Sequence, residues 1–128
     1  VAEFEDFVFI ATHFCHKSEI NRTAAAAELN SYAEEHFKSY DKPVFLAGDL
    51  NLSRTGSDAF LELLKSWKII TSNDYTMSTG NTRIDYVLIY TGNQVSYNVL
   101  GAAVPTFSEI DVYTVSDHLP VFVDLDKK

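Results

Sequence analysis

The fold class can be predicted from residues 7–47, which read FVFIATHFCHKSEINRTAAAAELNSYAEEHFKSYDKPVFLA. The run 7–12 is almost entirely apolar, as expected of a strand that is covered on both faces. Ser18 can cap a helix, and the 3.6-residue spacing of apolar side chains extends that helix to about Tyr40. A proline then ends the helical pattern before a second short apolar strand over residues 44–47. This strand–helix–strand order favours two parallel strands joined by a right-handed crossover.

The rest of the chain predicts one more helix, three strands and two loops. In chain order we expect a helix over 57–67, a loop over 71–82, strands over 83–90 and 94–100, a loop over 101–116, and a strand over 119–125. The first two of these strands are expected to pair with each other as a hairpin. The buried face of the first helix is expected to comprise Ala25, Leu29, Tyr32, Ala33, His36, Phe37 and Tyr40.

These elements predict a single α/β domain over residues 1–128, with a mixed β-sheet and helices packed on one face. The chain has 10 Lys and Arg against 18 Asp and Glu, a net charge of −8. This balance argues against broad, non-specific binding to a phosphate backbone, but a metal-dependent enzyme can take its positive charge from a bound cation. One cysteine, Cys15, excludes an internal disulfide framework, and no apolar run is long enough to predict a transmembrane segment.

Polar side chains gather where the predicted strands begin or end. They lie at residues 12–13, 48–51, 83–86 and 116–118, which read Thr-His, Gly-Asp-Leu-Asn, Arg-Ile-Asp-Tyr and Ser-Asp-His. Carboxylate and amide oxygens suit a hard cation such as Mg²⁺, and a histidine–carboxylate pair can move a proton. Together these residue types match the needs of a metal-assisted phosphoester hydrolase.

Each of these residues also has a simpler interpretation. Asp49 and Asn51 favour turns, His13 taken alone fits a structural histidine, and residues 117–118 could form a turn at the entry of a strand. Asp85 differs, because it lies inside an apolar strand where an unpaired carboxylate would be costly. A partner for Asp85 is therefore expected.

The four motifs, in this order and in this strand context, resemble those of the endonuclease/exonuclease/phosphatase family, the DNase I-like metal-dependent phosphohydrolases. Residues 12–13 resemble the family's T-H motif and residues 48–51 its G-D-[FL]-N motif. Residues 83–88 resemble R-[IL]-D-Y-[IV]-[LF], and residues 116–121 resemble S-D-H-x-P-[VIL]. The resemblance spans about residues 7–125 and implies the C-terminal half of a four-layer α/β sandwich.

The resemblance also implies a role for each matching residue. His118 would contact the scissile phosphate as general base or oriented donor, with Asp85 as its carboxylate partner. His13 would be a second active-site histidine, acting as general acid or stabilising the phosphate. The remaining implied roles concern water, metal and substrate: Asp49 and Asn51 would orient the attacking water and hold the phosphate or metal, Asp117 would join Asp49 at a Mg²⁺ or Mn²⁺ site, and Arg22 would contact the substrate.

The chain departs from the family pattern in length. The family's catalytic domain is about twice as long, and its N-terminal half supplies an asparagine and a metal-binding glutamate that have no counterpart here. We therefore expect this chain to be a partial domain that is inactive alone, or that needs either the missing N-terminal half or self-association to cover an apolar sheet face.

Three functions follow as hypotheses. The first is a metal-dependent phosphoester hydrolase of the phosphodiesterase, phosphatase or nuclease type. Its substrate would be a small phosphodiester or monoester, or a lipid headgroup, slightly ahead of nucleic acid, because the chain lacks interleaved aromatic and basic residues. The second is a non-catalytic binding or assembly module that keeps the fold, and the third is a fragment without function. Retention of Asp49, Asn51, Asp85, Asp117 and His118 together favours the hydrolase.

Overall fold

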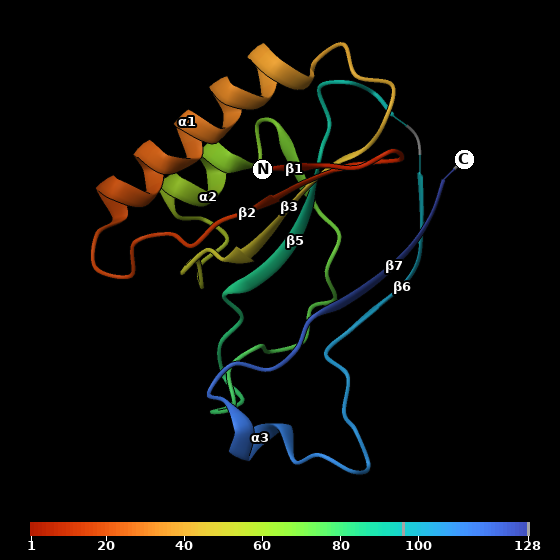
Figure 1. Cartoon of the computed structure of the whole chain (residues 1–128). Coiled ribbons are helices and arrows are strands. Elements are labelled where there is room, and N and C mark those ends of the chain that lie inside the picture. The colour runs from red at the N-terminus through yellow and green to blue at the C-terminus, as the bar shows by residue number, and fades with distance from the viewer. Residues whose placement is uncertain (96, 128) are drawn as a thin grey trace.

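The computed structural model describes residues 1–95 and 97–127 and places them in a five-stranded sheet, a separate two-stranded ribbon and short or long helices beside them (Figure 1). The sheet has the order β1-β2-β3-β5-β4. Its strands are β1 (Ala2–Glu3), β2 (Val8–Ala11), β3 (Val44–Asp49), β4 (Trp67–Ile69) and β5 (Asp85–Tyr90). The ribbon pairs β6 (Tyr97–Ala103) with β7 (Phe122–Lys127), and the helices are α1 (Glu19–Phe37), α2 (Asp58–Leu63) and α3 (Val112–Val115).

The predicted strand–helix–strand unit is confirmed, although α1 ends at Phe37 and not at about Tyr40. β2 and β3 pair in parallel, and α1 forms the connection between them. Ser18 caps α1 by accepting a hydrogen bond from the Asn21 amide at 3.2 Å. Ser57 caps α2 in the same way, by accepting a hydrogen bond from the Phe60 amide at 3.4 Å. β5 runs antiparallel to both β3 and β4, so the sheet is mixed.

The core lies between this sheet and the two longer helices, which lie together on one side of it (Figure 1). Its sheet side chains are Val8, Ile10, Val44, Leu46, Trp67, Tyr86, Leu88 and Tyr90, and its helix side chains are Ala26, Ala33, Phe37, Ala59, Phe60 and Leu63. This arrangement confirms the predicted fold class. None of the helices in the described residues is both long enough and apolar enough to cross a membrane.

Two side chains of the predicted helix face are not in the core. Tyr32 and His36 are exposed and contact each other, with ring centroids 4.3 Å apart and ring planes inclined by 47°. The buried face of α1 is narrower than predicted, because it is centred on Ala26, Ala33 and Phe37. Tyr32 and His36 lie one position, about 100° around the helix, from this line and therefore reach the surface.

The predicted hairpin of residues 83–90 and 94–100 is wrong. Both edges of β5 are occupied, one by β3 and the other by β4, so no edge remains for the following strand. That strand pairs instead with the C-terminal strand β7, in a ribbon on the side of the sheet opposite the two longer helices (Figure 1). Ser96, within the predicted strand, lies outside the described residues.

The predicted end of the second helix also needs correction. α2 ends at Leu63, and Trp67 begins β4 with its side chain only 2% exposed. The two predicted loops contain short regular elements as well. An isolated bridge joins Met77 to His118, and α3 lies within residues 101–116.

Candidate active site

Two acidic residues meet where β3 ends and β5 begins. Asp49 and Asp85 are direct partners in the antiparallel register of these strands. Because β2 runs parallel to β3, its C-terminal end, followed by His13, lies at the same edge of the sheet. The chain continues to pair there, since the Phe14 amide donates to the Asp49 carbonyl at 2.9 Å. The sheet topology therefore brings three of the predicted site residues together.

Gly48 permits this close approach of β2 and β3. It has a φ of +149°, and a Cβ atom added to it would lie 1.8 Å from the backbone oxygen of Thr12. No other residue fits this position without moving the backbone. The glycine of the G-D-L-N motif is thus required by the packing of the strand that carries Asp49.

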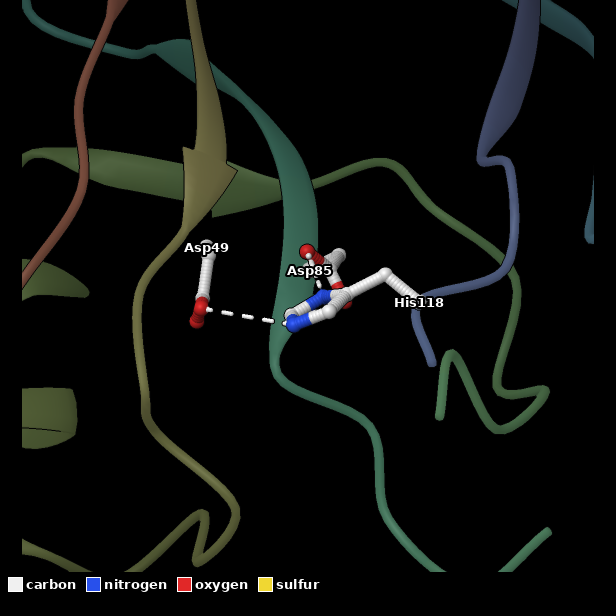
Figure 2. A group of neighbouring side chains, drawn as sticks. All are labelled: Asp49, Asp85 and His118. Atoms are coloured by element: carbon white, nitrogen blue, oxygen red, sulfur yellow. Dashed lines mark hydrogen bonds and ion pairs between the residues drawn. The ribbon is translucent and has the colours of Figure 1, made fainter. Parts of the chain in front are cut away.

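His118 comes from a distant part of the chain and completes the cluster (Figure 2). Its Nδ1 atom lies 3.1 Å from both carboxylate oxygens of Asp85, and its Nε2 atom lies 3.9 Å from Asp49 Oδ2. The His118 side chain is 35% exposed, whereas each carboxylate is only 18% exposed. The imidazole is therefore held between two carboxylates and still reaches solvent.

His13 lies on the other side of Asp49. Its Nε2 atom is 3.3 Å from Asp49 Oδ2, and its side chain is 70% exposed. Asp49 Oδ1 accepts a hydrogen bond from the Asn51 amide at 2.8 Å. Asn51 has a φ of 51°, and its Nδ2 donates to the Phe14 carbonyl at 3.0 Å. One carboxylate thus contacts three of the residues that the sequence placed in the site.

Two predicted site residues lie outside this cluster. The Arg22 guanidinium donates to Glu19 Oε2 and to the Cys15 carbonyl, both at 2.8 Å, and lines a hollow of about 910 Å³ that also borders Asn51. Asp117 has an exposed side chain next to His118. Their roles in substrate and metal binding stay predictions.

Sequence reasoning missed Thr76, which lies in the predicted surface loop and is only 1% exposed. Its hydroxyl lies 2.6 Å from Asp85 Oδ2 and also accepts hydrogen bonds from the amides of Ile84 and Asp85, at 3.1 and 3.2 Å. The sequence did indicate that Asp85, a carboxylate in an apolar strand, needs hydrogen-bond partners. It did not indicate which residues these partners are.

Charge raises the basicity of His118. Partial burial lowers the pKa of its imidazole, but the hydrogen bond to Asp85 and the charges of Asp85, Asp49 and Asp117 outweigh burial. The pKa of His118 therefore lies above its ordinary value. Such a group is suited to accept a proton and to contact an anion.

The cluster also fits a divalent cation. Asp49, Asp85 and His118 each offer one ligand atom, and these atoms lie within 4.8 Å of one another. Carboxylate oxygens are the ligands that Mg²⁺ prefers, and Mn²⁺ also accepts an imidazole nitrogen. Two carboxylates with limited exposure, at the open edge of a sheet, match a site that leaves room for water and substrate.

Comparison with protein families gives one match over most of the chain. The model of the Endonuclease/Exonuclease/phosphatase family matches residues 2–118. A comparison with curated proteins found no match.

Several solved structures share the fold. An endonuclease/exonuclease/phosphatase family protein from Bacteroides thetaiotaomicron is 19% identical with a TM-score of 0.73, covering 94% of this chain and 48% of that one. A mannosyl-6-phosphatase from the same species is 21% identical with a TM-score of 0.65, covering 91% and 50%. The human Nocturnin catalytic domain, with bound sulfate, is 19% identical with a TM-score of 0.71, covering 92% and 46%. The chain thus spans about half the length of the structures it matches.

Proposed function

Because the chain belongs to the endonuclease/exonuclease/phosphatase family, we propose that the cluster of Asp49, Asp85 and His118 hydrolyses a phosphoester by attack of water on phosphorus. The observation that carries the proposal is the contact of His118 Nδ1 with Asp85, which leaves Nε2 directed toward Asp49 (Figure 2). The mannosyl-6-phosphatase among the matched structures is consistent with phosphoester chemistry.

In this proposal His118 is the general base. An ionised Asp85 can only accept a hydrogen bond, so Nδ1 of the neutral ring donates and Nε2 carries the free lone pair. The carboxylate fixes the tautomer and stabilises the imidazolium that forms when Nε2 takes a proton from water. Asp49 and Asn51 orient this water.

His13 assists from the opposite side of Asp49. Its Nε2 lies beside Asp49, but most of the ring is exposed, so a phosphate oxygen can approach it, and the imidazolium would stabilise the negative charge that develops there. His13 and His118 both lie beside Asp49 and have different roles: His118 accepts a proton and His13 contacts the phosphate.

Mg²⁺ or Mn²⁺ is the proposed cofactor. Asp49 would hold it, with Asp117 as a second carboxylate at the exposed edge. When bound, the cation would polarise the phosphoryl oxygens and neutralise part of the negative charge of the carboxylates. Because the chain has a net charge of −8, it repels an anionic substrate, and a bound cation would reduce this repulsion.

A small phosphodiester or phosphomonoester, including a lipid headgroup, is the proposed substrate, ahead of nucleic acid. The cluster is acidic, and the Arg22 guanidinium, which lines the neighbouring hollow, is already paired with Glu19. A long phosphate backbone would therefore find few free cations near the reacting centre.

The proposal includes a polypeptide partner. The sheet face opposite the helices carries Phe9, Phe45 and Val87, and together with Leu119 and Phe122 it lines an apolar hollow of about 560 Å³. Large apolar surfaces of this kind are normally covered. We propose that either the N-terminal half of a complete domain of this family or a second copy of this chain covers this face. The covered protein is expected to hydrolyse phosphoesters faster.

The test is metal-dependent turnover. The chain is assayed with bis(4-nitrophenyl) phosphate and 4-nitrophenyl phosphate in Mg²⁺ or Mn²⁺, against His118→Ala and the matched control His36→Ala, which removes an exposed histidine on α1. We expect hydrolysis that EDTA abolishes, that His118→Ala removes and that His36→Ala keeps. Equal rates in all three proteins would contradict the proposal, as would absence of hydrolysis in a preparation whose apolar sheet face is covered.

A further inference from the structure

The segment 76–78 contacts both members of the His118–Asp85 pair. The Thr76 side chain reaches Asp85, as described above. The same segment also contacts the residues on either side of His118. The Leu119 amide donates to the Thr76 carbonyl at 2.7 Å, and the Ser78 amide donates to the Asp117 carbonyl at 2.8 Å.

The direction of the Thr76 hydrogen bond is fixed by its neighbours. A hydroxyl has one proton and two acceptor lone pairs. The amides of Ile84 and Asp85 both donate to the Thr76 oxygen, at 3.1 and 3.2 Å, and so occupy the lone pairs. The single proton is then directed to Asp85 Oδ2, 2.6 Å away. A partly buried carboxylate held in this way has little rotational freedom.

We infer that Thr76 is a positioning residue, which orients the Asp85 carboxylate so that His118 is held with its proton on Nδ1. Asp85 Oδ2 receives the Thr76 proton, and both carboxylate oxygens face His118 Nδ1 at 3.1 Å. Without the hydroxyl, the carboxylate can turn away from His118, and no acceptor then holds the proton on Nδ1. The consequence for turnover rests on the proposed function, whereas the consequence for the tautomer does not.

The first test is the tautomer of His118 in the chain itself. Imidazole ¹⁵N chemical shifts are recorded without metal, at a pH where the ring is neutral, for the original protein, Thr76→Val and Thr76→Ser. We expect Nδ1–H in the original protein and in Thr76→Ser, and a shift toward Nε2–H in Thr76→Val. A folded Thr76→Val protein that keeps Nδ1–H would overturn the inference.

A matched control separates positioning from a loss of buried polar groups. Thr71 lies nearby in the chain, and its buried Oγ1 has no hydrogen-bond partner among the described residues. Thr71→Val makes the same chemical change and is expected to leave the tautomer unchanged and the stability equal or higher. If Thr76→Val does not fold, Thr76→Cys replaces it and is compared with Thr76→Ser, which has nearly the same size and a stronger donor.

The second test is kinetic. Thr76→Val should lower kcat roughly 10- to 100-fold with little change in KM, and Thr76→Ser should restore most of it. A Thr76→Val protein that is less stable but keeps both its kcat and its tautomer would overturn the inference. If the original chain shows no turnover, that result counts against the proposed function alone, because the ¹⁵N measurement still decides the role of Thr76.

Discussion

His118 Nδ1 lies 3.1 Å from both carboxylate oxygens of Asp85, although 33 residues separate them in the chain. This contact predicts the effect of Asp85→Asn. The asparagine would turn its oxygen toward the Thr76 hydroxyl and its amino group toward His118, because the hydroxyl has only a proton to offer. Nδ1 would then have to accept, and the wrong tautomer would result.

We expect Asp85→Asn to lower kcat by about 10²-fold or more with little change in KM, since a general base contributes in this range. Steady-state kinetics with a chromogenic phosphodiester and Mg²⁺ measures both constants. Unchanged kcat in Asp85→Asn, alongside a large loss in His118→Ala, would show that the pairing has no catalytic role.

Gly48→Ala should destabilise the fold. Its methyl group would meet the Thr12 backbone oxygen at 1.8 Å, and its φ of +149° is unfavourable for any L side chain. The expected loss is about 2 kcal/mol or more in the free energy of unfolding, measured by urea denaturation.

Gly56→Ala provides the control for this measurement. A Cβ atom at Gly56 would meet nothing within 4 Å. This variant should unfold within about 0.5 kcal/mol of the original protein. Equal losses in both variants would argue against the close approach of β2 and β3.

Tyr90 should make the stability of the chain sensitive to alkaline pH. Burial, then the hydrogen bond to Glu34, raises the pKa of its phenol from 10.0 to about 12. Below pH 10 the phenol is neutral in both states and its contribution to stability is complete. Between pH 10 and 12 the unfolded chain loses the proton first, so the free energy of unfolding falls as pH rises.

Urea unfolding at several pH values, with absorbance at 295 nm to follow phenolate, tests this. Tyr90→Phe should reduce the fall in stability between pH 10 and 12; burial also raises the pKa of Tyr86 and of Tyr97, which account for the remainder. A matched Tyr75→Phe variant, which removes an exposed phenol, should keep the original slope. The same slope in both variants would contradict the assignment to Tyr90.

The apolar hollow between the sheet and β7 should cause association. Phe122 lines this hollow and is 52% exposed, so Phe122→Ser should weaken concentration-dependent association in sedimentation velocity. Leu61→Ser is the control, because Leu61 is 55% exposed on α2. A monomer that persists at high concentration in the original protein would contradict the prediction.

The elements that the sequence predicted well are those specified by local signals. The apolar run before His13, the Ser18 cap and the helical period together define a strand–helix–strand unit. Its parallel pairing places the end of β3, with Asp49, beside the end of β2. The motif around Asp85 lies at the start of a strand, so its meeting with Asp49 follows once β5 runs antiparallel to β3.

The elements that it missed depend on contacts distant in the chain. The local sequence after β5 correctly predicts a strand, but it does not identify the partner of that strand. The partner is β7 because β4 already occupies the second edge of β5. From the local sequence alone, Trp67 fits the last turn of a helix. Its place in a strand follows only from its pairing with Tyr90 of β5. Thr76 has a turn-rich neighbourhood, and only its three-dimensional position beside Asp85 gives it a role.

Asp49, Asp85 and His118 are proposed to form one active site, in which Asp49 holds a divalent cation and His118, paired with Asp85, acts on the phosphate group beside it. The most direct measurement is a ¹⁵N-edited NMR titration of the chain with Mg²⁺ and inorganic phosphate, repeated with Asp49→Asn. We predict saturable shifts centred on these three residues and their loss in Asp49→Asn. Absence of shifts, or shifts centred on α1 or on the β6–β7 ribbon, would contradict the account.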